Sequence, residues 1–181
     1  MNRRMIIILI LLLIWGGPKA LGILTDWLWF TDLGFAGVYR TRLLAQVTLF
    51  ILGAAGGLGL VWGSAVLATR LSRQAISAPH LLSGLLNERQ FAVTVAGGSL
   101  LVGLMLAGGF SGQWDQMLRF LRPTAFDAAD PLFGRDIAFF VFALPVYRFL
   151  QGWLLTAVLL ALLAGIGVYA FRLVLPQLPT K

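Results

Sequence analysis

The sequence predicts an all-α integral membrane protein with about four transmembrane helices. Of the 181 residues, 59% are hydrophobic and only 12% are charged, and long stretches carry no charge at all. A water-soluble domain usually has about 25% charged residues, so this composition cannot cover a water-facing surface. Because one bilayer crossing takes about 20 apolar residues, we expect residues 1–181 to form a single membrane domain of about four crossings.

The first predicted span covers residues 5–24 and follows Arg3 and Arg4. A secretory signal peptide begins in the same way. However, more apolar residues follow Lys19 and no clear cleavage site is present, so we favour a retained helix with a bend near Gly16 to Pro18. The second span covers 43–69. At 1.5 Å per residue it is about 40 Å long against a hydrocarbon core of about 30 Å, so it must tilt or protrude.

The third and fourth predicted spans cover 91–110 and 149–171. Two aromatic-rich segments, 26–42 and 111–145, separate spans one from two and three from four. Amphipathic aromatic rings settle at the headgroup level of a bilayer. We therefore expect both segments to lie along the membrane interface through residues that include Asp26, Trp27, Trp29 and Trp114.

Within 111–145 the sequence predicts two short helices. One covers 114–122 and has an apolar and a charged face. The other begins at Pro131, because aspartate at the N-cap followed by proline is a helix start signal, here Asp130 and Pro131. Asp127, Asp130 and Asp136 could instead be read as oxygen ligands of a cation, but we favour capping and an ion pair between Arg135 and Asp136.

Glycine spacing predicts close helix packing. In lipid, small residues let two helix backbones approach, which replaces the missing hydrophobic drive for association. The candidates on the second and third spans are Gly53, Gly57, Gly59, Gly63, Gly97 and Gly103. Packing within this chain is the simpler interpretation, and a seam with another protein is the alternative.

The charges predict an orientation and a location. Lys and Arg divide evenly between the two sides of the four-span topology, but six of the seven acids fall on the side of 26–42 and 111–145. Since the unbalanced basic side is normally cytoplasmic, we expect both termini in the cytoplasm of a multi-pass protein in the bacterial inner membrane. The net charge of +7 is scattered, which favours membrane lipids over nucleic acid as the partner.

The sequence offers no equipment for catalysis. It contains no cysteine, its single histidine, His80, lies between predicted spans, and no nucleotide, hydrolase or zinc motif is present. We therefore expect no enzyme activity, no metal site and no cofactor, and the sequence does not indicate whether a lipid or pigment binds. The spans lack charged groups apart from Lys19, which disfavours an ion pump formed by this chain alone.

Two stretches carry a family resemblance. They are Asp26-Trp27-Leu28-Trp29-Phe30, followed by Leu33-Gly34-Phe35, and Asp130-Pro131-Leu132-Phe133-Gly134-Arg135-Asp136-Ile137, followed by Leu144-Pro145. In their order and spacing they resemble the N-terminal membrane region of the large bacterial proteins grouped as uncharacterised protein family 0182. The resemblance implies a polytopic membrane protein, and it implies that this chain corresponds to a fragment or a shortened relative.

Two functions compete at this point. The first is a non-catalytic structural or assembly subunit of a larger bacterial membrane complex, such as an energy-converting one, that docks on other membrane-protein subunits. The alternative is the membrane part of a transporter or channel that other chains complete.

Overall fold

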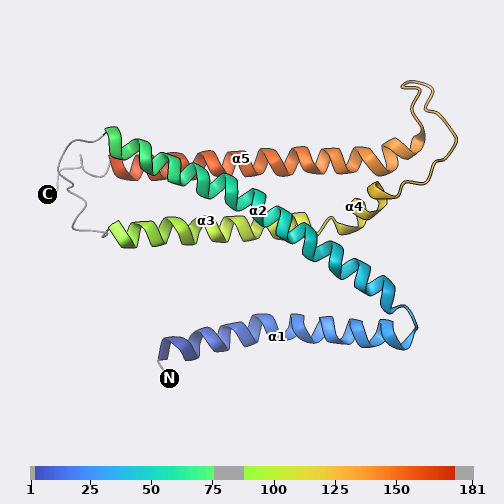
Figure 1. The fold of residues 1–181 in the computed structure, drawn as a ribbon, viewed down its shortest axis with the longest axis horizontal. Helices are drawn as coiled ribbons and strands as arrows, with labels where there is room; N and C mark the ends of the chain where they lie inside the picture. The colour runs from blue at the N-terminus through green and yellow to red at the C-terminus, as the bar shows by residue number, and fades with distance from the viewer. Residues whose placement is uncertain (1–2, 76–87, 174–181) are drawn as a thin grey trace. The chain divides into compact units, whose positions relative to one another are not determined.

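The computed structural model describes residues 3–75 and 88–173, and these are helical apart from turns and one connecting loop. The helices are α1 (Arg3–Asp32), α2 (Ala36–Ala75), α3 (Glu88–Ser111), α4 (Trp114–Leu121), the π-helix η2 (Phe139–Ala143) and α5 (Leu144–Leu173) (Figure 1). The all-α fold class is therefore confirmed. His80 lies outside the described residues.

The chain divides into two compact units, Met1–Leu44 and Ala45–Lys181. The first contains α1 and the beginning of α2. Helix α1 runs on to Asp32 with Pro18 inside it. The predicted first span, 5–24, therefore lies within α1, but the side chains before Ile14 lie outside the described residues.

The segment 26–42 does not form an element of its own. It consists of the last turns of α1, a tight turn and the first turns of α2. Gly34 has φ +77°, which L-residues rarely adopt, and it ends the helix. The Phe35 N–H donates to the Phe30 carbonyl at 2.8 Å and the Gly34 N–H to the Thr31 carbonyl at 3.0 Å, the hydrogen bonds of a Schellman C-cap.

Among the described residues, three helical stretches are long and apolar enough to cross a membrane: Ala36–Ser72, Arg89–Ser111 and Phe139–Phe171. They contain the predicted spans 43–69, 91–110 and 149–171. Each helix is longer than its uncharged run because Arg is a good helix former and does not end a helix. Arg40, Arg42 and Arg70 accordingly lie inside α2.

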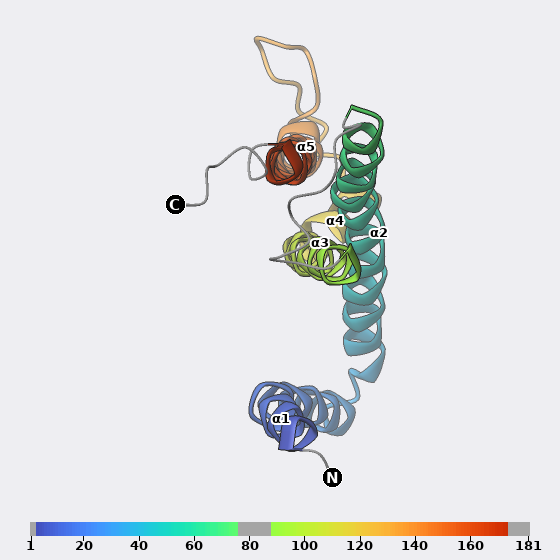
Figure 2. The same cartoon turned by 90° about the vertical axis from the view of Figure 1, so that its left-hand side faces the viewer.

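In the second unit α2 packs across both α3 and α5, which lie on the same side of it (Figure 2). Glycine makes the α2–α3 approach possible. A methyl group added to Gly53 would lie 2.7 Å from the Phe110 Cβ, and one on Gly57 would lie 3.1 Å from the Leu106 Cβ. One on Gly103, from the opposite helix, would lie 2.5 Å from the Leu58 Cδ2.

The other three predicted packing glycines face no neighbour in the described part of the chain. A methyl group on Gly59, Gly63 or Gly97 would have nothing within 4 Å. The two overlapping glycine spacings of α2 therefore differ in their surroundings, since only Gly53 and Gly57 lie against α3.

Hydrogen bonds to backbone carbonyls join α5 to its neighbours. The Trp153 indole N–H donates to the Leu106 carbonyl of α3 at 3.0 Å, and the Ser64 hydroxyl of α2 donates to the Ala161 carbonyl at 2.6 Å. Small and medium apolar residues fill the core around these contacts: Val61, Leu106, Ala157 and Ala161.

Large apolar side chains point outward from the same helices. Examples that are at least half exposed are Leu52, Trp62, Leu101, Met105, Leu155 and Leu163. Small residues inside and large apolar residues outside is the arrangement expected where lipid tails cover the outer surface.

Gly53→Ala is expected to destabilise the second unit, and Gly59→Ala is its matched control. Both changes improve the intrinsic helix propensity of α2 by about 1 kcal/mol. At Gly53, however, the new methyl group would also meet the Ala107 Cα at 3.0 Å, backbone that cannot move aside cheaply. We expect overpacking to cost about 1–3 kcal/mol. Thermal unfolding in mild detergent, followed by circular dichroism, compares the variants, and equal midpoints would contradict the packing described.

Candidate functional site

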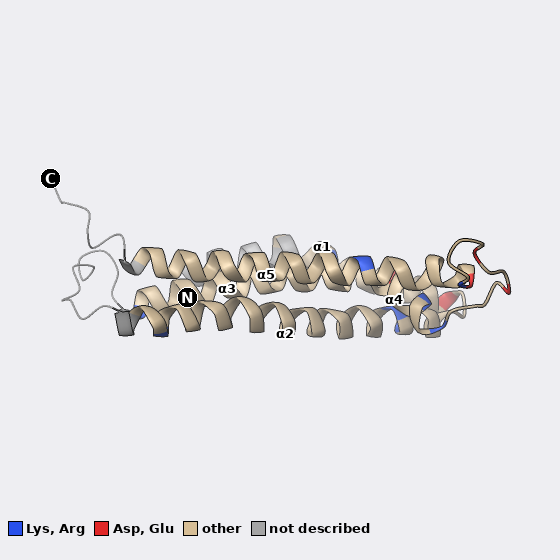
Figure 3. Ribbon diagram, turned by 90° about the horizontal axis from the view of Figure 1, so that it is seen from above, with Lys and Arg blue, Asp and Glu red and all other residues tan. Residues whose placement is uncertain are grey.

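The loop at 122–136, between α4 and η2, contains six of the predicted site residues: Asp130, Pro131, Phe133, Gly134, Arg135 and Asp136. It lies at one end of the second unit, where the ribbon is coloured for several acidic and basic residues while the long helices are mostly uncharged (Figure 3). Helix α4 precedes it. This helix covers Trp114–Leu121, one residue shorter than the predicted 114–122, and carries an ion pair of 2.9 Å between Asp115 and Arg119.

Asp136 organises the loop through its carboxylate. Oδ1 accepts hydrogen bonds from the Ala138 N–H at 2.7 Å and the Phe126 N–H at 3.3 Å, and Oδ2 accepts one from the Asp127 N–H at 3.2 Å. The bond to Ala138 caps the helix that leads into η2. Bonds of amides to an ionised carboxylate are stronger than neutral ones, so one side chain holds both ends of the loop.

Asp130 has the same chemical role in a tighter turn. Its Oδ1 accepts hydrogen bonds from the Leu132 and Phe133 N–H groups at 2.9 and 2.8 Å. Its own N–H donates to the Arg135 carbonyl at 2.7 Å, which closes the turn from the other side. Gly134, at φ +62°, lets the chain reverse there.

The prediction of a helix beginning at Pro131 is wrong. Residues 131–133 form a turn, and Ala129 and Asp136 are paired in an antiparallel bridge. The amides that would start a helix do bond to Asp130, as an N-cap requires. However, the left-handed conformation of Gly134 ends the turn after three residues, and the helix starts beyond Asp136.

Arg135 and Asp136 do not form the expected ion pair in the described part of the chain. Both Asp136 oxygens are bonded to amides, and the Arg135 guanidinium lies 4.5 Å from the centre of the Phe139 ring instead. Cations over aromatic faces are stabilised by the ring quadrupole. Within residues 3–75 and 88–173, no group of three or more His, Cys, Asp or Glu side chains is placed to hold a metal ion.

The π-helix η2 contacts the loop. It was not predicted from the sequence. The Leu144 N–H donates to the Phe139 carbonyl, five residues back. The signal for it is Pro145, which has no N–H to donate and whose ring would clash with the carbonyl four residues earlier in a regular α-helix. A wider turn just before the proline relieves that clash.

Aromatic rings pack between the loop and η2. The Phe126 ring stacks on Phe142 with 6.0 Å between centroids, and Phe133 approaches Phe140 at 5.9 Å. Leu132 and Phe133 nevertheless remain 81% and 66% exposed. These two residues form an apolar surface held in place by the two aspartates.

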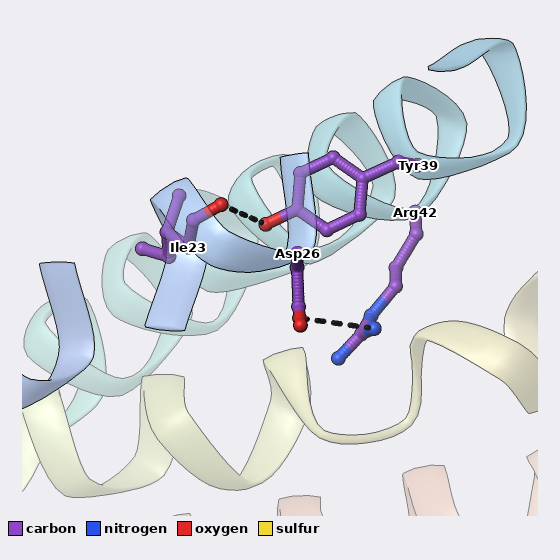
Figure 4. A network of polar contacts seen from close by, with 4 residues as sticks. All are labelled: Ile23, Asp26, Tyr39 and Arg42. Atoms are coloured by element: carbon purple, nitrogen blue, oxygen red, sulfur yellow. Dashed lines mark hydrogen bonds and ion pairs between the residues drawn. The ribbon is translucent and has the colours of Figure 1, made fainter. Parts of the chain in front are cut away.

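A second polar arrangement closes the α1–α2 turn in the first unit (Figure 4). The Tyr39 hydroxyl donates to the Ile23 carbonyl at 3.1 Å, and an Arg42 guanidinium nitrogen lies 3.9 Å from the Asp26 carboxylate. Tyr39 is only 3% exposed and its ring contacts Trp27 and Phe30. Asp26 and Trp27 thus hold two helices together, whereas Trp29 is exposed. The sequence reasoning missed Tyr39 as the centre of this contact.

Asp136→Asn is expected to loosen the loop. Asp127→Asn removes the same charge with the same small change in shape, and it is expected to leave the loop intact. Asparagine at 136 loses the negative charge and one of two acceptor oxygens. We expect a cost of about 1.5–3 kcal/mol, the range for a hydrogen bond to a charged group. Hydrogen exchange of the 126–138 amides measures the effect. Unchanged protection in Asp136→Asn would show that the carboxylate does not organise the loop.

Comparison with known proteins places the chain in a family. The model of the Uncharacterised protein family (UPF0182) matches residues 3–178. The chain is similar to the UPF0182 protein of Cupriavidus necator, with 38% identity over 160 residues that cover 85% of this chain and 18% of that protein. It is also similar to UPF0182 proteins of Rhodococcus jostii (36% identity, 83% of this chain, 16% of that protein) and Moorella thermoacetica (36%, 77% and 16%).

No solved structure matches the chain. The chain spans less than a fifth of the length of these curated relatives, so it corresponds to one region of a much longer protein type. With a family model matched over nearly its whole length and relatives more than 30% identical, the chain belongs to the UPF0182 family.

Proposed function

We propose that this chain is a structural membrane module, a non-catalytic part that anchors and packs a larger bacterial membrane assembly. One observation carries the proposal. Helices α2, α3 and α5 pack through glycine and other small residues and present large apolar side chains outward. Such a bundle suits a membrane environment, where close packing rather than hydrophobic burial joins helices.

The polar contacts inside the bundle support the same role. Ser64 and Trp153 donate to backbone carbonyls of neighbouring helices, which satisfies donors that would be costly to leave unpaired in an apolar interior. Because these two side chains are bonded to neighbouring helices, they join the helices and do not line a path for ions. The proposal extends to membrane lipids and other membrane-protein subunits as partners.

The proposed topology has four spans in the bacterial inner membrane, with both termini in the cytoplasm. It is supported by the three apolar helices and by the position of the acids: Asp115, Asp127, Asp130 and Asp136 all follow α3 and precede α5. An acid-rich segment of this kind balances its own arginines and is the side expected to face away from the cytoplasm.

Single cysteines at Arg89 and Ala128 are expected to react with an impermeant maleimide from opposite sides of the membrane. Both positions are exposed, Arg89 lies at the start of α3 and Ala128 lies in the loop beyond its other end, and the sequence contains no cysteine. In intact cells Ala128→Cys should label and Arg89→Cys should label only after permeabilisation. Labelling of both from one side would refute a spanning α3, and the reverse pattern would refute the proposed orientation.

Purification in mild detergent separates a structural module from the transporter alternative. We expect the chain to elute in constant stoichiometry with a defined larger assembly. Vesicles containing the chain should show no proton or potassium flux above that of empty vesicles, because the packed helices offer no charged pathway. Flux that depends on the chain and is lost in Gly53→Leu would favour the transporter or channel.

A further inference from the structure

Lys19 lies near the middle of α1, which crosses the membrane in the proposed four-span topology. Its side chain is exposed, and no carboxylate pairs with it in the part of the chain that the structure describes. Charged side chains inside a membrane are costly, and they almost always pair with one another or with backbone carbonyls. An unpaired lysine at this position therefore marks a place where a group from outside the chain is required.

The depth of Lys19 follows from the end of α1 that meets α2. Trp29 and the ion pair between Asp26 and Arg42 lie there, and such groups belong at headgroup level (Figure 4). Asp26 follows Lys19 by seven residues, which corresponds to about 10 Å along the helix. A lysine side chain of five bonds, each about 1.5 Å long, reaches only about 6 Å from its Cα atom. The ammonium group therefore lies in the hydrocarbon layer.

The helix also directs Lys19 away from the nearer membrane surface. Each Cα–Cβ bond of an α-helix tilts toward the helix N-terminus, whereas the nearer surface lies at the C-terminal end of α1. The side chain therefore leaves the helix toward the middle of the membrane. It would have to fold back on itself to approach a lipid phosphate, which disfavours the snorkelling seen for lysines near the ends of spans.

No other span of this chain can supply the missing carboxylate. All seven acidic residues of the sequence lie outside 43–69, 91–110 and 149–171. A second copy of the chain has the same composition, so it would bring another intramembrane lysine and no acid. Charge complementarity therefore points to a different polypeptide.

We propose that α1 docks, through Lys19, on a transmembrane helix of another membrane-protein subunit that carries an Asp or Glu at the same depth. The pair removes the cost of two separate charges in lipid. The surface of α1 allows the approach, because Gly16 and Gly22 lie one turn away from Lys19 on either side. A methyl group added to either glycine would have nothing within 4 Å. This inference rests on the proposed membrane role and names the chemistry of the partner.

The pairing is tested with the whole chain in phosphatidylcholine vesicles and a synthetic leucine-rich transmembrane helix of about 20 residues. This helix carries Asp at the depth of Lys19, or Asn as its uncharged control. The chain is the parent or Lys19→Met, which keeps the length of the side chain and removes the charge. Energy transfer between dyes should show association about tenfold stronger for the parent with the Asp helix than for the other three combinations. Similar association in all four combinations overturns the proposal.

A lipid occupant is tested by adding phosphatidylglycerol to the same vesicles. An ammonium group held by a partner carboxylate should keep its preference for the Asp helix. Loss of that preference would show that headgroup phosphates occupy Lys19, and the proposed partner would be wrong.

The membrane role is tested separately, with a nitroxide at Leu21→Cys. Leu21 is 65% exposed and lies on the side of α1 opposite Lys19, because two residues turn an α-helix by about 200°. The nitroxide should collide with oxygen more than with a water-soluble nickel complex. The reverse pattern overturns the membrane role of α1, whereas a lipid-like pattern without preference for the Asp helix overturns the docking proposal alone.

Discussion

The close approach of α2 to α3 at Gly53, Gly57 and Gly103 is the contact on which the second unit depends. Lipid tails are as apolar as leucine, so burying leucine gives two helices no reason to associate in a membrane. Contact between backbones, possible only where side chains are absent, has to supply that reason. The approach places Leu106 and Phe110 where Trp153 can reach them, and Trp153 in turn sets the level of α5.

The position of α5 relative to α3 determines the arrangement of the rest of the second unit. Once α5 is fixed beside α3, its projecting first turns and η2 determine where the 122–136 loop begins to fold. The loop then uses backbone hydrogen bonds of a different kind, in which carboxylates of Asp130 and Asp136 collect amides that have no helix to join. Hydroxyl and indole donors serve carbonyls inside the bundle, and carboxylate acceptors serve amides outside it. Inside the bundle the side-chain donors bond to carbonyls that already belong to a helix, whereas in the loop the carboxylates pair amides that have no helical partner.

The sequence predicted the helical class, the long apolar stretches and the family, because these depend on composition, on uncharged runs and on the spacing of whole motifs. It was less informative where a local signal has two readings. Asp130 with Pro131 begins a helix in many proteins, but the decision here depends on Gly134, three residues further on, and on the pairing of Ala129 with Asp136. Likewise the aromatic run after Asp26 does not reveal that Tyr39 reaches back to Ile23. Contacts between residues far apart in sequence leave no periodic trace.

The π-helix at Phe139–Ala143 changes the directions in which side chains point on the two sides of it along the continuous helix of η2 and α5. Its wider turn takes up about one more residue than an α-helical turn, which shifts the angular register of everything after it by roughly 100°. The rings at 139 and 140 can therefore face the loop while Trp153 and Ala157 face α2 and α3, although all four belong to a single unbroken helix. The direction in which this helix faces the loop is therefore independent of the direction in which it faces α2 and α3. Adding or removing one residue in the π-turn would rotate the loop around the bundle without altering a single side chain in the glycine-packed core.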